Sequence, residues 1–300
     1  MNYINNQLKT ITLCQSGGKK INQRIINEDI VGTDDGYAFL MDGATGLGGP
    51  ESINGLSVAE WYVQFVADFL KTELPNKDKD IKLIVTEAIQ YATIKIKKYE
   101  DDNNIKFEAF SEPSSSLIIY RRFERNGTKY FQVFELGDSC AAIKYRDGKI
   151  NKLYNPNEFA LKALDNSVLN RMLEISKQEK INVIDTRNNP EIQKMLEINR
   201  AKKNIEGGYW ALGTNIDAVN HAALYEEPVT DVEKVLLYSD GFNYDILDLT
   251  IEDILNNYKN ENDFKILQEK IREAEELDKN ANKQARFKMH DDMSLILIEH

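Results

Sequence analysis

Short turns between apolar runs limit the folds open to this chain more than any other feature of its sequence. Residues 116–125 and 128–138 flank Asn126-Gly127, a dipeptide typical of a two-residue β-hairpin. Two further turns, at 146–148 and at 34–36, also end in Gly and separate apolar runs. Because strands joined by such short turns pair antiparallel, residues 116–154 are predicted to form an antiparallel meander. The pattern excludes a doubly wound parallel sheet.

Helical periodicity covers most of the remaining chain. Apolar side chains recur every three or four residues in 56–70 and 79–99, and residues 157–177 and 190–203 are also predicted to be helical. Residues 250–279 are predicted to be helical and strongly charged, and a strand at 293–299 closes the chain. Strands and helices that come in separate batches predict an α+β sandwich, in which helices face two antiparallel sheets.

Charge and cysteine content exclude several classes of protein. The 300 residues carry 38 basic and 49 acidic side chains, a net charge of −11. Nucleic acids and anionic membranes attract basic surfaces, so neither is an expected partner. Cys14 and Cys140 are too few for a disulfide framework, and no apolar run approaches the roughly 18 residues of a membrane span. Because the N-terminus also lacks a basic, apolar leader, the sequence predicts a soluble, cytoplasmic protein.

Acidic residues stand at the ends of five predicted strands. The pairs are Glu28-Asp29, Asp42-Gly43, Gly137-Asp138, Asp240-Gly241 and Asp291-Asp292. A single acid at a strand end is usually a solvated turn residue, but five in one sheet protein would repel one another unless a cation held them. No cluster of His, Cys or basic residues accompanies them, and an all-oxygen set suits Mg²⁺ or Mn²⁺. The pattern therefore predicts a dinuclear hydrolytic site and leaves its substrate open.

These motifs, in this order, resemble the metal-dependent Ser/Thr protein phosphatases of type 2C (the PPM family), and in particular a bacterial-type member. The resemblance runs from Arg24 to Asp291-Asp292-Met293-Ser294, nearly the whole chain. It implies a single domain over residues 1–300, folded as a four-layer α-β-β-α sandwich of two antiparallel sheets flanked by helices. It also implies two Mg²⁺ or Mn²⁺ ions in a cleft at one edge. A helical, flap-like insertion at about 155–205 is expected to border this cleft and to select substrates.

The resemblance assigns a role to each matched residue. The implied metal ligands are Glu28, Asp42, the carbonyl of Gly43, Asp240 and Asp291. Among them, Asp42 would bridge the two ions. Arg24 would grip the substrate phosphate as a bidentate fork. Asp29 would orient coordinated waters, and Asp138 matches a position that holds a third, weaker metal in some members.

Three positions depart from the family pattern. Ala44 stands where many members have a His, so the identity of the general acid is open. Tyr244 stands where many members have an acid, which leaves the third metal in question. Asp292 occupies a position where Asn is frequent, and it is either an aid to a ligand or only a charge at a strand edge.

The resemblance implies that a phosphorylated protein is the substrate and partner of a monomeric enzyme. Phosphoserine or phosphothreonine would be hydrolysed by direct attack of a metal-bridging water. One alternative is a catalytically inactive pseudophosphatase that acts as a binding module, and another is a two-metal phosphatase acting on a small-molecule phosphate ester. The retained acids argue against the first, because a binding module has no need of mutually repelling carboxylates. Nothing in the sequence separates the second from a protein phosphatase.

Overall fold

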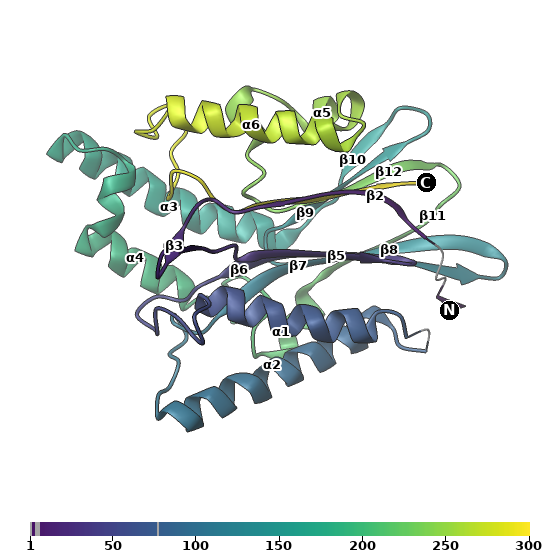
Figure 1. Ribbon diagram of the computed structural model, residues 1–300, viewed down its shortest axis with the longest axis horizontal. Coiled ribbons are helices and arrows are strands. Elements are labelled where there is room, and N and C mark those ends of the chain that lie inside the picture. The colour runs from purple at the N-terminus through teal and green to yellow at the C-terminus, as the bar shows by residue number, and fades with distance from the viewer. Residues whose placement is uncertain (1, 4–6, 77) are drawn as a thin grey trace.

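The computed structural model describes residues 2–3, 7–76 and 78–300. Two antiparallel sheets lie face to face between two outer layers of helices, as Figure 1 shows. The predicted four-layer α-β-β-α sandwich is therefore confirmed. No helix within the described ranges is both long and apolar enough to cross a membrane.

The first sheet has the strand order β11-β8-β7-β6-β5, and β1 pairs with β7. Its strands are β1 (Asn2–Tyr3), β5 (Asp29–Asp34), β6 (Tyr37–Ala44), β7 (Ser114–Arg125), β8 (Thr128–Leu136) and β11 (Ala223–Pro228). Between β7 and β8, Asn126 and Gly127 have positive φ angles of 52° and 76°. Two positive φ angles in succession are the mark of a type I′ turn, so the predicted hairpin is confirmed.

The second sheet has the strand order β10-β9-β12-β13-β2. Its strands are β2 (Lys9–Gln15), β9 (Cys140–Tyr145), β10 (Ile150–Lys152), β12 (Val232–Tyr238) and β13 (Met293–Glu299), and the short β3 (Lys20–Ile21) and β4 (Arg24–Ile25) pair separately. The continuous meander predicted for 116–154 is wrong, because β8 and β9 belong to different sheets. Gly137 allows the crossing: its φ is 94°, and a Cβ there would lie 2.6 Å from Cβ of Ser116.

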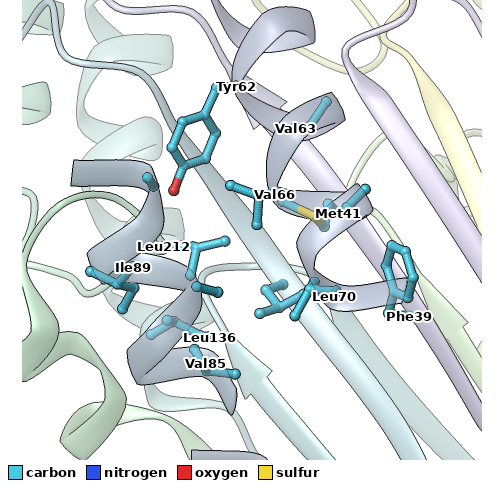
Figure 2. Close-up of a cluster of buried hydrophobic side chains, with 14 of the residues drawn as sticks. Phe39, Met41, Tyr62, Val63, Val66, Leu70, Val85, Ile89, Leu136 and Leu212 are labelled. Carbon is cyan, nitrogen blue, oxygen red and sulfur yellow. The ribbon is translucent and has the colours of Figure 1, made fainter. Parts of the chain in front are cut away.

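Helices α1 (Val58–Glu73) and α2 (Ile81–Asn103) cover the outer face of the first sheet. Figure 2 shows their contact, in which Phe39 and Met41 of β6 lie beside Val66 and Leu70 of α1, with Ile89 of α2 in the same cluster. All five side chains are completely buried. Burial of one such side chain contributes roughly 1.5–3 kcal/mol, so this layer holds the sheet firmly beneath the acidic strand ends.

Helices α5 (Ile251–Asn257) and α6 (Glu261–Leu277) cover the second sheet. The sequence predicted one helical stretch over 250–279, and the structure interrupts it at 258–260. Asn260 begins α6 with a capping box, in which its side chain accepts from the Asp263 amide and Asp263 accepts from the Asn260 amide. These reciprocal bonds satisfy backbone donors that a continuous helix would have paired with its preceding turn.

Helices α3 (Pro156–Glu179) and α4 (Pro190–Arg200) lie at one end of the sandwich, on the left in Figure 1. The 3₁₀ helix η1 (Ile184–Asn188) connects them. Their own small apolar cluster includes Val168, Met172 and Ile192. This group of helices, residues 155–205, is called the flap-like segment below. The other 3₁₀ helices are η2 (Ile216–His221) and η3 (Tyr244–Leu247).

Candidate metal centre

The acidic strand ends meet at one end of the two sheets. Asp29, at the start of β5, is the register partner of Asp42, near the end of β6. In the second sheet, β12 ends at Tyr238 and β13 begins at Met293, so Asp240 and Asp291 leave neighbouring strands at the same end. Strand register pairs the acids within each sheet, and the packing of the two sheets brings Asp29 and Asp240, more than 200 residues apart in sequence, close enough to interact.

A cavity of about 310 Å³ opens at this end of the sheets. Its acidic lining residues are Glu28, Asp42, Asp138, Asp165, Asp240 and Asp291, and Gly43 lines it as well. All five of the sequence-predicted ligands thus border one cavity. Asp29 and Asp292 are not among the lining residues, although both are buried nearby. Residues of α3, η1 and α4 complete the wall, so the flap-like segment borders the cavity.

The carboxylates lie close enough to shift one another's ionisation. Burial, together with the charges of Asp29 and Asp240, raises the pKa of Asp42 well above its usual value. Burial also raises the pKa of Asp240, with Asp291 as the next cause. Burial and then Asp240 raise the pKa of Asp138 to about 8. Mutual repulsion of this kind is the electrostatic condition that a bound cation relieves.

Asp29 joins the two sheets behind the cavity. Its Oδ2 accepts hydrogen bonds from Ser294 Oγ at 2.6 Å and from Ser239 Oγ at 3.1 Å, both on the second sheet side. Its Oδ1 is buried and has no hydrogen-bond partner among the described residues. Burial raises the pKa of Asp29 to about 8. Asp29 is therefore held firmly, with one acceptor oxygen left unsatisfied beside the cavity.

Asp292 positions the loop that carries Glu28. Its Oδ1 accepts from the Gly17 amide and its Oδ2 from the Glu28 amide, each at 2.6 Å. Sequence reasoning left its role open between an aid to a ligand and a strand-edge charge. These two hydrogen bonds favour the role of an aid to a ligand, because one of them holds the backbone of Glu28, an expected ligand.

Two glycines beside the acids allow close backbone approaches. A Cβ on Gly43 would lie 2.6 Å from the carbonyl oxygen of Glu28, and one on Gly241 would lie 1.8 Å from that of Asp292. Neither approach tolerates a side chain, since real Cβ atoms do not come that close to backbone. The Gly that follows each acid is thus needed for packing at the site, and not only for a turn.

Cationic side chains also line the cavity, and sequence reasoning missed them. Lys19 Nζ lies 2.9 Å from Glu28 Oε1, and Lys288 Nζ lies 2.6 Å from Asp291 Oδ1. Although burial acts in the opposite direction, these ammonium groups hold the pKa of Glu28 and that of Asp291 below their usual values. Arg187 and Arg200 line the cavity too. None of the four stands at a predicted strand end, so no pattern distinguished them from surface charges.

Arg24, the expected phosphate ligand, is engaged elsewhere. Its Nη1 donates to Glu60 Oε1 at 2.9 Å, its Nη2 pairs with the second oxygen of Glu60, and Nη2 also donates to the Gly55 carbonyl at 3.1 Å. Arg24 is not among the residues that line the cavity. Its role as a phosphate ligand stays a prediction, and it requires that this ion pair open.

Two further residues lie near the site but outside this cavity. His290 lies between carboxylates: Nδ1 is 2.7 Å from Glu275 and Nε2 is 2.8 Å from Glu276. It does not line the cavity. Tyr244 lines a second cavity of about 220 Å³. After burial and Asp240, the charge of Asp165 in α3 is the next cause of the raised pKa of Asp138. No strand-end pattern indicated Asp165.

The residues present fit hard divalent cations by their chemistry. Every donor is a carboxylate or carbonyl oxygen, the type that Mg²⁺ and Mn²⁺ prefer. The unsatisfied Oδ1 of Asp29 and the repulsion among the acids both favour added positive charge. No three His, Cys, Asp or Glu side chains within the described ranges converge as a ready-made metal cluster. Two of the expected ligands, Glu28 and Asp291, contact ammonium groups instead.

The chain matches known phosphatases in sequence and in fold. The family model for protein phosphatase 2C matches residues 16–284. The serine/threonine phosphatase Stp1 from Staphylococcus aureus is 16% identical, with a TM-score of 0.53 over 99% of this chain and 97% of that one. The serine/threonine phosphatase PstP/Ppp from Mycobacterium tuberculosis is 17% identical, with a TM-score of 0.55 over 97% and 98%. No curated protein matches the sequence closely enough to count as a relative. With the family model covering most of its length, the chain belongs to the protein phosphatase 2C family of Ser/Thr protein phosphatases.

Proposed function

We propose that this protein hydrolyses phosphoserine or phosphothreonine in proteins and that the reaction depends on two Mg²⁺ or Mn²⁺ ions. The observation that carries the proposal is that Glu28, Asp42, Asp240 and Asp291 border a single cavity. One solved neighbour is the catalytic domain of PstP in complex with two manganese ions, 17% identical with a TM-score of 0.50. That complex supports the expectation of two ions here.

The proposed ligand assignment follows the sequence. Asp42 and the Gly43 carbonyl lie at the end of β6, where Asp42 would contact both ions. Glu28 and the Gly43 carbonyl would bind one ion, and Asp240 and Asp291 would bind the other. Divalent ions in such a site acidify a coordinated water and neutralise phosphate charge.

The chain's own residues prepare the site for this chemistry. Asp292 fixes the Glu28 backbone by accepting from its amide at 2.6 Å. Asp29 is fixed by two serine hydroxyls and keeps one buried oxygen without a hydrogen-bond partner among the described residues. Thr45 Oγ1 donates to Glu28 Oε1 at 2.6 Å and so orients that carboxylate. Side chains that are already held in place by such hydrogen bonds lose little conformational entropy when substrate binds.

A turnover assay tests the proposal. A phosphothreonine peptide and p-nitrophenyl phosphate are each offered with Mn²⁺, without it, and after EDTA treatment. We expect peptide hydrolysis that requires the metal and that EDTA abolishes. Asp240→Asn should lower kcat/KM by roughly a hundredfold or more, the scale on which loss of one charge-stabilising group acts.

The matched control is Asp147→Asn. Asp147 is an exposed turn acid whose Oδ1 accepts from the Lys149 amide at 2.9 Å, and its change should leave turnover intact. Hydrolysis of the small ester with none of the peptide would favour a small-molecule phosphatase. Failure to turn over either substrate with metal bound would favour a binding module and contradict the proposal.

A further inference from the structure

Four cationic side chains line the cavity, and they fall into two kinds. Lys19 and Lys288 are each paired with a carboxylate, Glu28 and Asp291 respectively. Arg187 and Arg200 form no ion pair with any residue in the described ranges. Within the described ranges the Arg187 guanidinium donates one hydrogen bond, a long one of 3.4 Å to the Phe287 carbonyl. Two guanidinium groups therefore face an acidic cavity without carboxylate partners of their own.

The backbone positions of the two arginines are well supported. Arg187 lies in η1, where its carbonyl accepts from Gln193 Nε2 at 2.6 Å and its neighbour Thr186 is completely buried. Arg200 is the last residue of α4, and the side chain of the preceding Asn199 donates to the Leu164 carbonyl of α3 at 3.1 Å. Anchors of this kind fix the backbone from which both side chains reach the cavity.

The two arginines also lie close to each other and to the acids. Burial lowers the pKa of Arg187, Asp291 opposes that effect, and the charge of Arg200 lowers the pKa further. Arg200 in turn acts on Asp138 and on Asp165. Both arginines line the same cavity, where a bound anion would relieve the repulsion between them.

The charge of the cavity indicates which anion. Among the described residues, its lining holds six carboxylates and four cationic side chains, a formal charge of −2. Two divalent ions, as in the proposed function, would change this to +2. A phosphate monoester is close to a dianion at neutral pH, so it would neutralise the site. Without Arg187 and Arg200 the same sum would be zero, and the cavity would not attract a dianion.

We propose that Arg187 and Arg200, both on the flap-like segment, bind the phosphate group of the substrate. The inference rests on the proposed function and extends it to the recognition of phosphate. It leaves the role of Arg24 a separate prediction, because the Arg24 guanidinium binds both oxygens of Glu60 and the Gly55 carbonyl in this structure. Guanidinium forks match phosphate oxygens in pairs, which a lysine cannot do.

Direct binding of inorganic phosphate tests this inference without turnover. Phosphate is titrated into the full-length protein at saturating Mg²⁺ and followed by calorimetry and by phosphorus NMR. We expect Arg187→Gln and Arg200→Gln each to weaken the Kd for phosphate roughly tenfold to a hundredfold, as for loss of a charged hydrogen bond. Arg200→Lys should restore only part of the affinity. The Kd for Mg²⁺ and the melting temperature should stay unchanged.

Two further variants make the test specific. Arg171→Gln is the matched control, because Arg171 also lies on the flap-like segment but pairs with Glu174 and Glu191 at 2.7 Å. It should bind phosphate like the wild type. Arg24→Gln reports on Arg24 alone: a loss of phosphate affinity there, beside losses in Arg187→Gln and Arg200→Gln, would mean that all three arginines bind the phosphate.

Opposite results would overturn the inference. Wild-type phosphate affinity in Arg187→Gln and Arg200→Gln, with affinity lost in Arg24→Gln, would return the phosphate site to Arg24. Loss of Mg²⁺ binding in the two flap variants would mean that these arginines shape the metal centre instead. Either result leaves the proposed phosphatase activity standing, whereas a wild-type protein that binds phosphate but hydrolyses no ester would contradict only that activity.

Discussion

Glu135 is a carboxyl group that the fold buries completely. It lies in β8, its side chain is fully excluded from solvent, and neither of its oxygens meets a hydrogen-bond donor in the described part of the chain. Burial raises its pKa from 4.5 to about 8. The folded protein therefore keeps a proton on Glu135 at a pH where the unfolded chain has released it.

The pH dependence of stability should reveal this proton. Between about pH 4.5 and pH 8 the folded state binds one more proton here than the unfolded state, so the free energy of unfolding falls as pH rises. The slope for a single proton is about 1.4 kcal/mol per pH unit. Glu135→Gln should flatten the profile by up to that amount. Denaturant unfolding across the interval measures it, with the exposed Glu51→Gln as control, and equal slopes in wild type and Glu135→Gln would contradict the assignment.

Residue by residue, the strand-end acids of the site were predictable, whereas Asp165 and the cations were not. Asp42 lies near the end of the apolar strand β6 and Asp240 lies two residues after β12, so the strands decide where these acids lie. Arg187 and Arg200 belong to a 3₁₀ helix and a helix end, whose direction depends on how the flap-like segment packs. For Arg24 the sequence motif predicted a role, but it did not predict the contact with Glu60 of α1, which arises only in the tertiary structure.

Among the elements, tight turns were the most predictable feature. Asn126-Gly127 adopts the turn that its dipeptide favours, because the two positive φ angles are a local property. The crossing between sheets at Gly137 was missed, since the same Gly would also suit a hairpin. The break between α5 and α6 was missed for a different reason: the Asn260 and Asp263 capping signal lies inside a charged stretch whose periodicity continues across it.

The junction of β12 and β13 depends on Gly241. A Cβ there would lie 1.8 Å from the Asp292 carbonyl oxygen, so Gly241→Ala must push the two strand ends apart. We expect a loss of stability of roughly 1–3 kcal/mol, as for overpacking in a core. The same shift displaces Asp240 and Asp292, so stabilisation by Mn²⁺ should shrink.

The control for this change is Gly49→Ala, where the new Cβ would meet its neighbours at an ordinary 3.5–3.6 Å. Denaturant unfolding with and without Mn²⁺ compares the two variants. Equal stability in Gly241→Ala and Gly49→Ala would show that the strand ends are not tightly packed.

At the scale of the whole molecule, the site exists only because two sheets meet. Asp29 and Asp42 come from the first sheet, and Asp240 and Asp291 come from the second. The hydroxyls of Ser239 and Ser294 bind Asp29 across the interface. The packing of the two sheets therefore brings the acids together. In the metal-free protein these acids repel one another.

Thermal unfolding of wild type and Asp42→Asn, with and without Mn²⁺, tests this convergence most directly because it needs no substrate. Asp42→Asn keeps the shape of the side chain and removes one repelling charge. It should raise the melting temperature of the metal-free protein. It should also reduce the gain that Mn²⁺ gives, because binding to the folded state is the source of that gain. Asp147→Asn should show neither effect. A lower metal-free melting temperature in Asp42→Asn, together with an intact Mn²⁺ shift, would contradict the assignment of Asp42 to a metal centre.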